Sequence, residues 1–346
     1  MPSSPAGQVW ARPRFRGAYY NGRLPLTEKL LIERIIERSR RRSRRSGSGV
    51  GVLQGIGDDC ARLRIPPGFE TLVTTDLSVE GVHFRRDWHP PESVGHRCLA
   101  RGLSDIAAMG GEPVAAFLSM GLPPDLPQSW VDRFLDGLLA LARRFNITLA
   151  GGDTAESPQG VTCDIVLVGQ VPSGRAVLRS GARPGHGIYV TGELGAAAAV
   201  LEQLRRGRFR GKPRSKAAPH FFPTPRVEAG RILREKKLAT AMIDVSDGLS
   251  SDLGHLCQES GVGAVVVEAS IPRPNVSHGL SLALHGGDDY ELLFTARRPV
   301  PEKLAGVRVT RIGEIVPGRK MWLADGKGRR KVLRPEGWEH FARSSG

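Results

Sequence analysis

The sequence predicts an α/β (α+β) fold of two domains, and three observations lead to this prediction. Segments with the pattern of strands alternate with segments whose apolar residues recur at helical spacing. A connection that contains Gly and Pro, at residues 179–187, separates two such series. The 346 residues suffice for two domains of ordinary size. We therefore expect one domain over residues 26–178 and a second over residues 179–346.

Each expected element of the first domain has a local reason. Thr27 can cap a helix that fades into the basic run 40–45, and Pro91 suits the first turn of another helix. Gly110 and Gly111 are expected to end that second helix. We expect an α/β or split βαβ arrangement. The expected elements are a helix after Thr27, a strand at 71–75, a helix at 91–108, a strand at 114–120, a helix at 128–145, and strands at 147–150 and 161–171.

The second domain is expected to continue the alternation of strands and helices. A basic segment at residues 205–217 interrupts it, and we expect this segment to be an insert in a surface loop. The expected elements are a strand at 188–191, a helix at 226–236, a strand at 242–245, a helix at 248–259, strands at 262–267 and 291–295, and a β-rich tail.

The formal net charge of +15 comes from two segments. Residues 1–48 contain 12 Lys/Arg and 3 Asp/Glu, a net charge of +9, and residues 205–216 add 7 Lys/Arg and no acid. The rest of the chain therefore has a net charge near −1. Basic arms can bind nucleic acid or anionic surfaces. A solvated arm is the simpler explanation, so we expect residues 1–25 to be a basic, disordered extension without a nucleic-acid partner.

The composition also argues against two other classes of protein. No apolar run approaches the length needed to span a bilayer, and the N-terminus lacks the apolar region of a signal peptide. The four cysteines have no CxxC spacing, so neither a zinc site nor a disulfide framework is indicated. We expect reduced thiols in a cytoplasmic protein that does not enter a membrane.

Aspartates beside Gly, Ser or Thr recur along the chain and are the main functional signal. Adjacent carboxylates repel each other, so a pair such as Asp58 and Asp59 costs stability unless a cation or basic group neutralises its charge. Several of these acids follow an expected strand, where ligands bind in open α/β folds. The segments are Gly55-Ile-Gly-Asp-Asp59, Thr74-Thr-Asp76, Ser104-Asp105, Gly151-Gly-Asp-Thr154, Asp244-Val-Ser-Asp247 and Gly286-Gly-Asp-Asp289.

Carboxylate, hydroxyl and carbonyl oxygens together form the ligand set of Mg²⁺ or Ca²⁺. We therefore predict that the fold gathers most of these aspartates into one site, where hard cations bridge the protein to polyphosphate. Phosphoryl transfer needs such cations, because the donor and acceptor phosphates otherwise repel each other. The chain has no Walker A motif, no protein-kinase motif set and no GxGxxG fingerprint.

Each residue taken alone also has a plain structural explanation. A Gly-Asp-Asp segment can be a simple turn, and Asp247 can cap the helix that follows it. Arg179 can be a surface charge, His83 a structural histidine, and Trp338 part of the core or of a docked tail. Asp105 is harder to explain, because a carboxylate late in a helix opposes the helix dipole. The ordered set of motifs, rather than any one of them, carries the prediction.

Taken in order, these segments and three others resemble the thiamine-monophosphate kinase family, which belongs to the aminoimidazole ribonucleotide synthetase superfamily. The resemblance covers roughly residues 26–342, and the ordered set is far more specific than any single motif. The three further segments are Gly81-Val-His-Phe84, Arg179-Ser-Gly181 and Gly337-Trp-Glu-His-Phe341.

The resemblance implies a two-domain aminoimidazole ribonucleotide synthetase-like fold. Its N-terminal split-βαβ domain would pair into a homodimer across a shared β-barrel and bind ATP and Mg²⁺, and its C-terminal domain would be α/β. The implied reaction is ATP-dependent phosphorylation of thiamine monophosphate to thiamine diphosphate. It would proceed by direct in-line transfer without a phosphoenzyme, with two or more Mg²⁺ ions.

The matching motifs assign roles to individual residues. The residues implied in catalysis are Asp59, Asp105, Asp153 and Asp247. The residues implied in metal binding are Asp59, Thr74, Thr75, Asp76, Asp105, Asp153, Asp244 and Asp247. The residues implied in ATP binding are Gly152, Asp153, Arg179 and Ser246. The residues implied in binding thiamine monophosphate are His83, Asp288 and Trp338. Asp288 stands where the family usually has Glu, and its side chain has a shorter reach.

Two other interpretations remain open. One is another ATP-using member of the superfamily. A selenophosphate synthetase would need a reactive Cys or Sec and a Lys in its N-terminal loop, but this arm has no Cys and its first Lys is Lys29. The hydrogenase-maturation relative would need a C-terminal Cys, and this chain ends at Gly346. The other interpretation is a nucleic-acid-binding protein that uses the basic arm.

Overall fold

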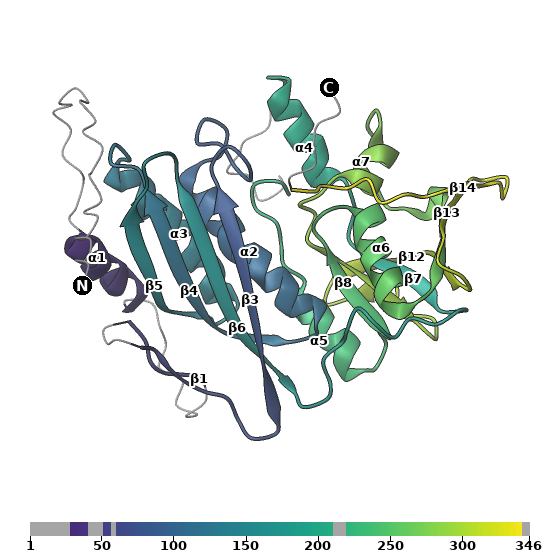
Figure 1. The fold of residues 1–346 in the computed structure, drawn as a ribbon, viewed down its shortest axis with the longest axis horizontal. Coiled ribbons are helices and arrows are strands. Elements are labelled where there is room, and N and C mark those ends of the chain that lie inside the picture. Colours follow the sequence, from purple (N-terminus) through teal and green to yellow (C-terminus); the bar gives the residue numbers. More distant parts are fainter. Residues whose placement is uncertain (1–27, 41–50, 57–59, 210–218, 341–346) are drawn as a thin grey trace, which may run out of the picture.

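The computed structural model describes residues 28–40, 51–56, 60–209 and 219–340. They form two large sheets and a small two-stranded sheet of β1 (Gly51–Gln54) and β2 (Arg62–Arg64), with helices packed between and beside the large ones (Figure 1). The expected extension at 1–25 and most of the expected insert at 205–217 lie outside the described residues. Within the described ranges, no helix has both the length and the apolar character needed to cross a bilayer.

The N-terminal half is a four-stranded sheet with helices on one face. Its elements are α1 Glu28–Arg40, β1 Gly51–Gln54, β2 Arg62–Arg64, β3 Phe69–Val79, α2 Pro91–Ala108, β4 Glu112–Leu122, α3 Gln128–Arg144, β5 Thr148–Glu156 and β6 Thr162–Pro172. The strand order is β3-β6-β4-β5. Neighbours are antiparallel except β4 and β5, which run parallel because α3 connects them. This is the expected split βαβ arrangement.

Proline and glycine residues determine where helix α2 begins and ends and how closely it crosses α3. Pro91 occupies the first turn of α2, and Gly110 follows that helix with a left-handed φ of 66°. The two helices cross closely through Gly95 and Gly137. A Cβ at either glycine would lie 1.9 Å from a backbone carbonyl oxygen of the other helix. Only glycine therefore permits this crossing distance.

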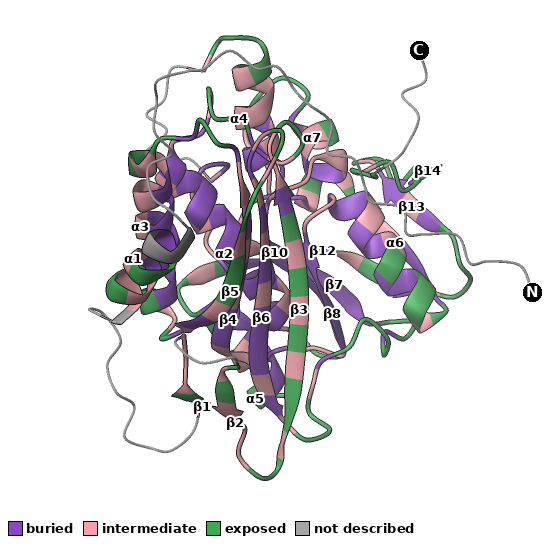
Figure 2. Ribbon diagram, turned by 60° about the vertical axis from the view of Figure 1, so that its left-hand side comes forward, coloured by how far each residue is buried: buried purple, intermediate pink, exposed green. Residues whose placement is uncertain are grey.

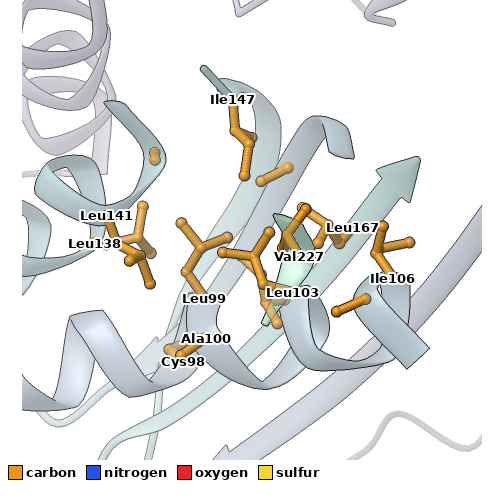
Figure 3. Packing of buried hydrophobic residues seen from close by; sticks show 14 of the residues in the cluster. Cys98, Leu99, Ala100, Leu103, Ile106, Leu138, Leu141, Ile147, Leu167 and Val227 are labelled. Atoms are coloured by element: carbon orange, nitrogen blue, oxygen red, sulfur yellow. The ribbon is translucent and has the colours of Figure 1, made fainter. Parts of the chain in front are cut away.

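The main hydrophobic core lies between α2, α3 and the inner face of the four-stranded sheet (Figure 3). Leu99 and Leu103 of α2, Leu138 of α3 and Leu167 of β6 are all completely buried there. Leu99 and Leu103 are four residues apart in α2. The buried Phe134, Leu138 and Leu141 recur at four- and three-residue spacing in α3. The apolar stripe of each helix therefore faces the sheet.

The outer face of the same sheet is only partly covered. Val168, which alternates with the core residue Leu167, packs in a small cluster with residues of β1 and β2. Toward the β3 edge this cover ends, and Figure 2 shows exposed positions along β3. Val73 and Leu77 of this strand are 66% and 49% exposed. The sheet thus presents exposed apolar side chains on the face opposite the helices.

The C-terminal half is an eight-stranded sheet flanked by helices. Its elements are β7 Gly187–Thr191, α4 Ala196–Arg205, α5 Val227–Glu235, β8 Ala241–Val245, α6 Leu249–Ser260, β9 Gly263–Val267, the 3₁₀ helix η1 Glu268–Ser270, α7 Gly279–His285, β10 Glu291–Ala296, β11 Lys303–Leu304, β12 Val307–Val316, β13 Met321–Ala324 and β14 Arg330–Val332. The order is β14-β13-β9-β12-β7-β10-β8, with β11 paired to β12. Strands β7, β8 and β10 are buried along their whole length, as expected for strands covered on both faces.

Helix α2 joins the two halves. One side of it faces the four-stranded sheet, and the other packs against α5 and β8. The main core accordingly includes Val227, Met242 and Phe294 from the C-terminal half. Gly230 of α5 sits so close to α2 that a Cβ there would lie 2.1 Å from Ala107 O. The two halves therefore share one apolar cluster around α2, and a second cluster lies within the C-terminal half.

The predicted α/β fold and nearly all of its expected elements are confirmed, but two strand ends were predicted wrongly. Asp76 and Asp153 lie inside β3 and β5 rather than after them. The sequence analysis ended these strands where their apolar runs stop. Backbone pairing continues beyond that point, because β6 and β4 supply hydrogen-bonding partners to polar residues as well. The short elements β1, β2, α4 and α7 were not predicted.

We expect Gly137→Ala to lower the free energy of unfolding by about 3 kcal/mol, because the added methyl group forces α2 and α3 apart. Alanine's higher helix propensity, about 1 kcal/mol, offsets part of the loss. Urea unfolding followed by circular dichroism measures the change. Gly326→Ala is the control, since a Cβ there meets no atom within 4 Å. Equal stability of the two variants would contradict the close crossing.

Candidate functional site

Helix α2 presents a row of charged side chains to the C-terminal half. Arg97, Arg101 and Asp105 are spaced by four residues, so they lie along one side of the helix. The Arg97 side chain is 5% exposed and that of Arg101 is 16% exposed. Buried charges need partners. These three residues therefore mark a polar region within an otherwise apolar junction.

Strand β3 supplies the first partners. Thr74 and Asp76 point to the same side of the strand because alternate residues share a face. Arg101 Nη2 lies 2.6 Å from Asp76 Oδ1, and the Thr74 hydroxyl donates to Asp105. Burial raises the pKa of Asp76 to about 6 against the attraction of Arg101. Burial likewise raises the pKa of Asp105 against the Thr74 hydrogen bond.

Strand β8 adds another carboxylate to the region. Asp244, near the end of β8, is 4% exposed, and Ser104 Oγ donates to its Oδ2 over 2.7 Å. Burial and the negative charge of Asp105 raise the pKa of Asp244 to about 7. Asp76, Asp105 and Asp244 come from three separate elements. They therefore gather negative charge in a region with little water to screen it.

The turn from β8 into α6 is organised by Asp252, which the sequence analysis did not single out. Asp252 Oδ2 accepts hydrogen bonds from the N–H groups of Ser246, Asp247 and Gly248 at 3.1, 3.2 and 3.0 Å. Burial and the charges of Asp244 and Asp247 raise the pKa of Asp252 to about 8 against these donors. Asp247 makes no capping hydrogen bond to α6. Its half-buried carboxylate instead interacts electrostatically with the charged groups of the site.

The two aspartates of the second Gly-Asp-Asp segment have different surroundings. Asp289 is buried, and its Oδ2 accepts a hydrogen bond from Gly195 N at the start of α4 over 2.6 Å, a structural role. Asp288 turns the other way, with a left-handed φ of 70°. Gly287 fits against the β8–α6 turn, where a Cβ would lie 2.4 Å from Ser246 O. Asp288 is thereby brought next to the turn.

Asp288 faces the charged row of α2. Arg97 Nη2 donates to Asp288 Oδ2 over 2.9 Å and to His83 O over 3.4 Å. Tyr290 Oη donates to Asp288 Oδ1 over 2.7 Å. Although burial opposes it, Arg97 holds the pKa of Asp288 well below its usual range. Burial and the charge of Arg101 lower the pKa of His83 to about 4, so its imidazole is neutral near pH 7.

The C-terminal tail docks onto the same turn. Trp338 N donates to Asp247 O over 3.0 Å, and a Cβ at Gly337 would lie 2.2 Å from that oxygen. The Trp338 ring stands edge-on to His340 at 5.7 Å, and His340 is 5.3 Å from the His83 ring. The indole is 49% exposed. His83, Asp288 and Trp338 therefore border one region, although they are far apart in the sequence.

Some expected site residues are placed elsewhere. Thr75 lies on the outer face of β3, where its hydroxyl donates to Asp164 over 2.8 Å. Asp153 is exposed on β5, at the sheet edge opposite β3, and its carboxylate accepts the Thr154 N–H. Gly152 precedes it in a conformation where a Cβ would lie 1.8 Å from a backbone oxygen of β4. Asp59 lies outside the described residues.

Arg179 and Ser246 lie nearer to the buried acids. Arg179 is exposed on the loop after β6, yet its positive charge reaches Asp105 and Asp244. Ser246 lies in the β8–α6 turn, and its carbonyl oxygen accepts the Asp288 N–H over 2.8 Å. Both residues expected to contact the nucleotide thus border the region of Asp105 and Asp244.

The donor atoms fit a hard divalent cation, because they are carboxylate and hydroxyl oxygens. Among the described residues, however, no three acidic, His or Cys side chains are close enough to hold one ion together. The contacts explain this. Asp76 is paired with Arg101, and Asp105 and Asp244 are each bound to a hydroxyl group. The carboxylates suit Mg²⁺ chemically, but each already has a partner.

Four residues at the site were missed by the sequence analysis. Two of them, Arg97 and Arg101, had a usable signal, because they precede Asp105 at intervals of four in an apolar helix. Asp252 could have been noticed as an acid in the first turn of an expected helix. Tyr290 gave no signal, because its role depends on its left-handed backbone, with a φ of 51°.

We expect Asp244→Asn to stabilise the metal-free protein at pH 8 by roughly 2 kcal/mol or more. The folded carboxyl has its pKa raised, to about 7, so between about pH 4 and 7 the folded state holds a proton that the unfolded state has lost. Stability therefore falls as pH rises through that window. Asn avoids this loss and can still accept the Ser104 hydrogen bond.

Asp288→Asn is the matched control with the opposite sign, because Arg97 favours the charged form of Asp288. This variant should be less stable than the parent at pH 8 and at pH 5 alike, because the stabilisation from the lowered pKa of Asp288 is lost only as the pH falls below about 4. Thermal unfolding in a chelating buffer at pH 5 and pH 8 measures both variants. The same direction of change for the two would contradict the description of these carboxylates.

Comparison with known proteins agrees with this architecture. Residues 57–171 match the family model of the AIR synthase related protein, N-terminal domain, and residues 183–323 match its C-terminal domain. The thiamine-monophosphate kinase of Salmonella typhimurium is 41% identical over 296 residues, covering 82% of this chain and 86% of that protein.

Two solved structures show the same fold at moderate identity. The thiamine-monophosphate kinase of Stenotrophomonas maltophilia K279a has a TM-score of 0.74 at 34% identity, covering 86% of this chain and 96% of that one. AaThiL complexed with AMPPCP and TMP has a TM-score of 0.70 at 30% identity, covering 91% and 97%. This chain belongs to the thiamine-monophosphate kinase family, among the AIR synthase related proteins.

Proposed function

We propose that this chain transfers the terminal phosphoryl group of ATP to the phosphate of thiamine monophosphate, yielding ADP and thiamine diphosphate. The observation that carries the proposal is the convergence of Asp76, Asp105 and Asp244 from β3, α2 and β8. Family membership identifies the reaction, and the related AaThiL was solved with AMPPCP and TMP. Direct in-line transfer, which the family resemblance implies, needs no phosphoenzyme intermediate.

The buried acids provide the electrostatic reason for this chemistry. Two phosphorylated molecules repel each other, and cations must neutralise them before the oxygen atoms can approach. We assign Mg²⁺ to Asp76, Asp105, Asp244 and Asp247, with Thr74 beside them, and bound Mg²⁺ would supply charge neutralisation. The contribution of the protein is to fix these carboxylates on two sheets and one helix, so that little reorganisation is needed.

The nucleotide side of the site is proposed to include Gly152, Asp153, Arg179 and Ser246. The lack of a side chain at Gly152 lets β5 lie close to β4, because a Cβ there would be 1.8 Å from Leu118 O, and this places Asp153 next to that strand. Arg179 brings a guanidinium group toward Asp105, which suits phosphate oxygens. Asp59, Thr75 and Asp153 complete the proposed metal set. Thr75 and Asp153 lie away from the buried acids, so their role requires phosphates or a second copy of the chain to extend the site across the sheet.

The substrate side is proposed to be formed by His83, Asp288 and Trp338. Thiamine carries a cationic thiazolium ring, which is attracted to an indole face and to a carboxylate. The Trp338 indole is half exposed and docked near His83. Asp288 is 30% exposed although Arg97 and Tyr290 already contact it. Its carboxylate oxygens therefore have remaining capacity to accept a hydrogen bond.

We further propose a homodimer in the cytoplasm. The apolar residues Val73 and Leu77 on the outer face of the four-stranded sheet are exposed in a single chain, and pairing of two such sheets would cover them. All four cysteines are free thiols, which suits a reducing compartment.

The proposed function is tested by a coupled assay of ADP release with thiamine monophosphate as acceptor. We expect turnover with thiamine monophosphate and Mg²⁺, and none with thiamine or with aminoimidazole-pathway substrates. The Asp105→Asn variant should lose about a hundredfold or more in kcat, as when other electrostatic contributors are removed. Turnover with an aminoimidazole substrate in place of thiamine monophosphate would instead indicate another member of the superfamily.

Trp338→Ala should raise the KM for thiamine monophosphate by about tenfold while changing the KM for ATP much less, because cation–π contact is lost on one side only. Trp322→Ala, in β13, is the control for loss of an indole. Steady-state kinetics with each substrate varied in turn gives both constants. A larger effect on ATP would remove Trp338 from the substrate side.

A further inference from the structure

Arg101 occupies an unusual position in the site. It projects from the middle of α2 into the group of buried acids, and its Nη2 lies 2.6 Å from Asp76 Oδ1. The two side chains are 16% and 21% exposed. This pair therefore places a positive charge where the proposed function requires a metal ligand.

The neighbouring arginine, Arg97, shows how a buried guanidinium on this helix can have its donors satisfied. Arg97, one turn earlier on α2, donates to His220 O, to His83 O and to Asp288. Arg101 Nε, by contrast, is buried with no hydrogen-bond partner among the described residues. Buried donors are nearly always paired, and an unpaired one costs about 1–3 kcal/mol. The guanidinium of Arg101 thus has an unused donor close to the acids.

A divalent ion and the Arg101 guanidinium can share Asp76 only at a cost in free energy. Both are cations, and at contact distance in a poorly solvated region their repulsion is worth several kcal/mol. A metal ion that takes Asp76 must therefore displace Arg101. The displaced group needs an anion nearby. Asp105, Asp244 and Asp288 already have partners. Asp247, the remaining described acid within reach of Arg101, is itself assigned to the metal.

We propose that Arg101 acts as a built-in cation that holds Asp76 until a metal-bound phosphate ligand arrives, and that it then moves onto a phosphate oxygen. Arg101 would thus contact a reacting phosphate in the loaded enzyme. The planar guanidinium suits this exchange, because it can bind carboxylate and phosphate alike. The proposal rests on the proposed function only for the identity of the phosphates. Its consequence is that metal alone binds weakly and metal with nucleotide binds well.

Titration calorimetry with Mg²⁺ alone tests the first half of the proposal on the full-length chain. Arg101→Gln should bind Mg²⁺ at least about tenfold more tightly than the parent without nucleotide, because Asp76 is freed. Arg133→Gln removes an equally charged side chain from a partly buried pair with Glu92, outside the acid cluster, and it should behave as the parent. A Mg²⁺ affinity of Arg101→Gln within threefold of the parent would overturn the proposal. If this variant folds only when Mg²⁺ is added, measured by circular dichroism, the proposal is supported.

Arg101→Lys tests the second half, and it keeps a positive charge that can hold Asp76. We expect Arg101→Lys to bind Mg²⁺ alone as weakly as the parent does. Its kcat should be lowered about tenfold or more, because the lysine ammonium lacks the paired, planar N–H donors with which a guanidinium binds two phosphate oxygens. A parent-like kcat would exclude phosphate contact by Arg101. The calorimetric difference between the parent and Arg101→Gln does not depend on the acceptor. It would therefore stand even if thiamine monophosphate proved not to be the substrate.

Discussion

The constraint on which the structure depends is the cost of burying several carboxylates at one junction. Asp76, Asp105 and Asp244 converge between two sheets, and burial raises the pKa of each. Hydrophobic packing around α2 holds them there regardless of their repulsion. The fold thus stores unfavourable electrostatics that favourable ligands can relieve, which is a recurrent property of catalytic sites.

The junction is precise because backbones approach closely where glycines permit it. Gly137 brings α3 onto α2, and Gly230 brings α5 onto the other side of α2. Gly287 and Gly337 bring the Asp288 segment and the C-terminal tail against the β8–α6 turn. Most of these glycines lie outside the acid motifs. The geometry of the site therefore depends as much on the absence of side chains as on the charged ones.

The fold was largely predictable from the sequence, because apolar periodicity reports burial directly. Helix α2, for example, was expected at residues 91–108 and has those bounds. Strand ends were less predictable, since pairing with a neighbouring strand extends β3 through Asp76 and β5 through Asp153. The motifs identified acids that do meet, but they could not show that Thr75 faces away from Thr74. They also could not show that Asp288 faces the site while Asp289 binds the N–H at the start of α4. This difference depends on the left-handed backbone of Asp288.

Helix α2 has a consequence for the behaviour of the whole molecule. Residues of both halves pack into one cluster around it, and a second cluster lies wholly within the C-terminal half, so the N-terminal half in particular has no complete interior without the other. The boundary that we expected between residues 178 and 179 would therefore divide this shared cluster. The chain should melt as a single cooperative unit rather than half by half. A fragment ending at that boundary would expose the apolar side of α2 to water.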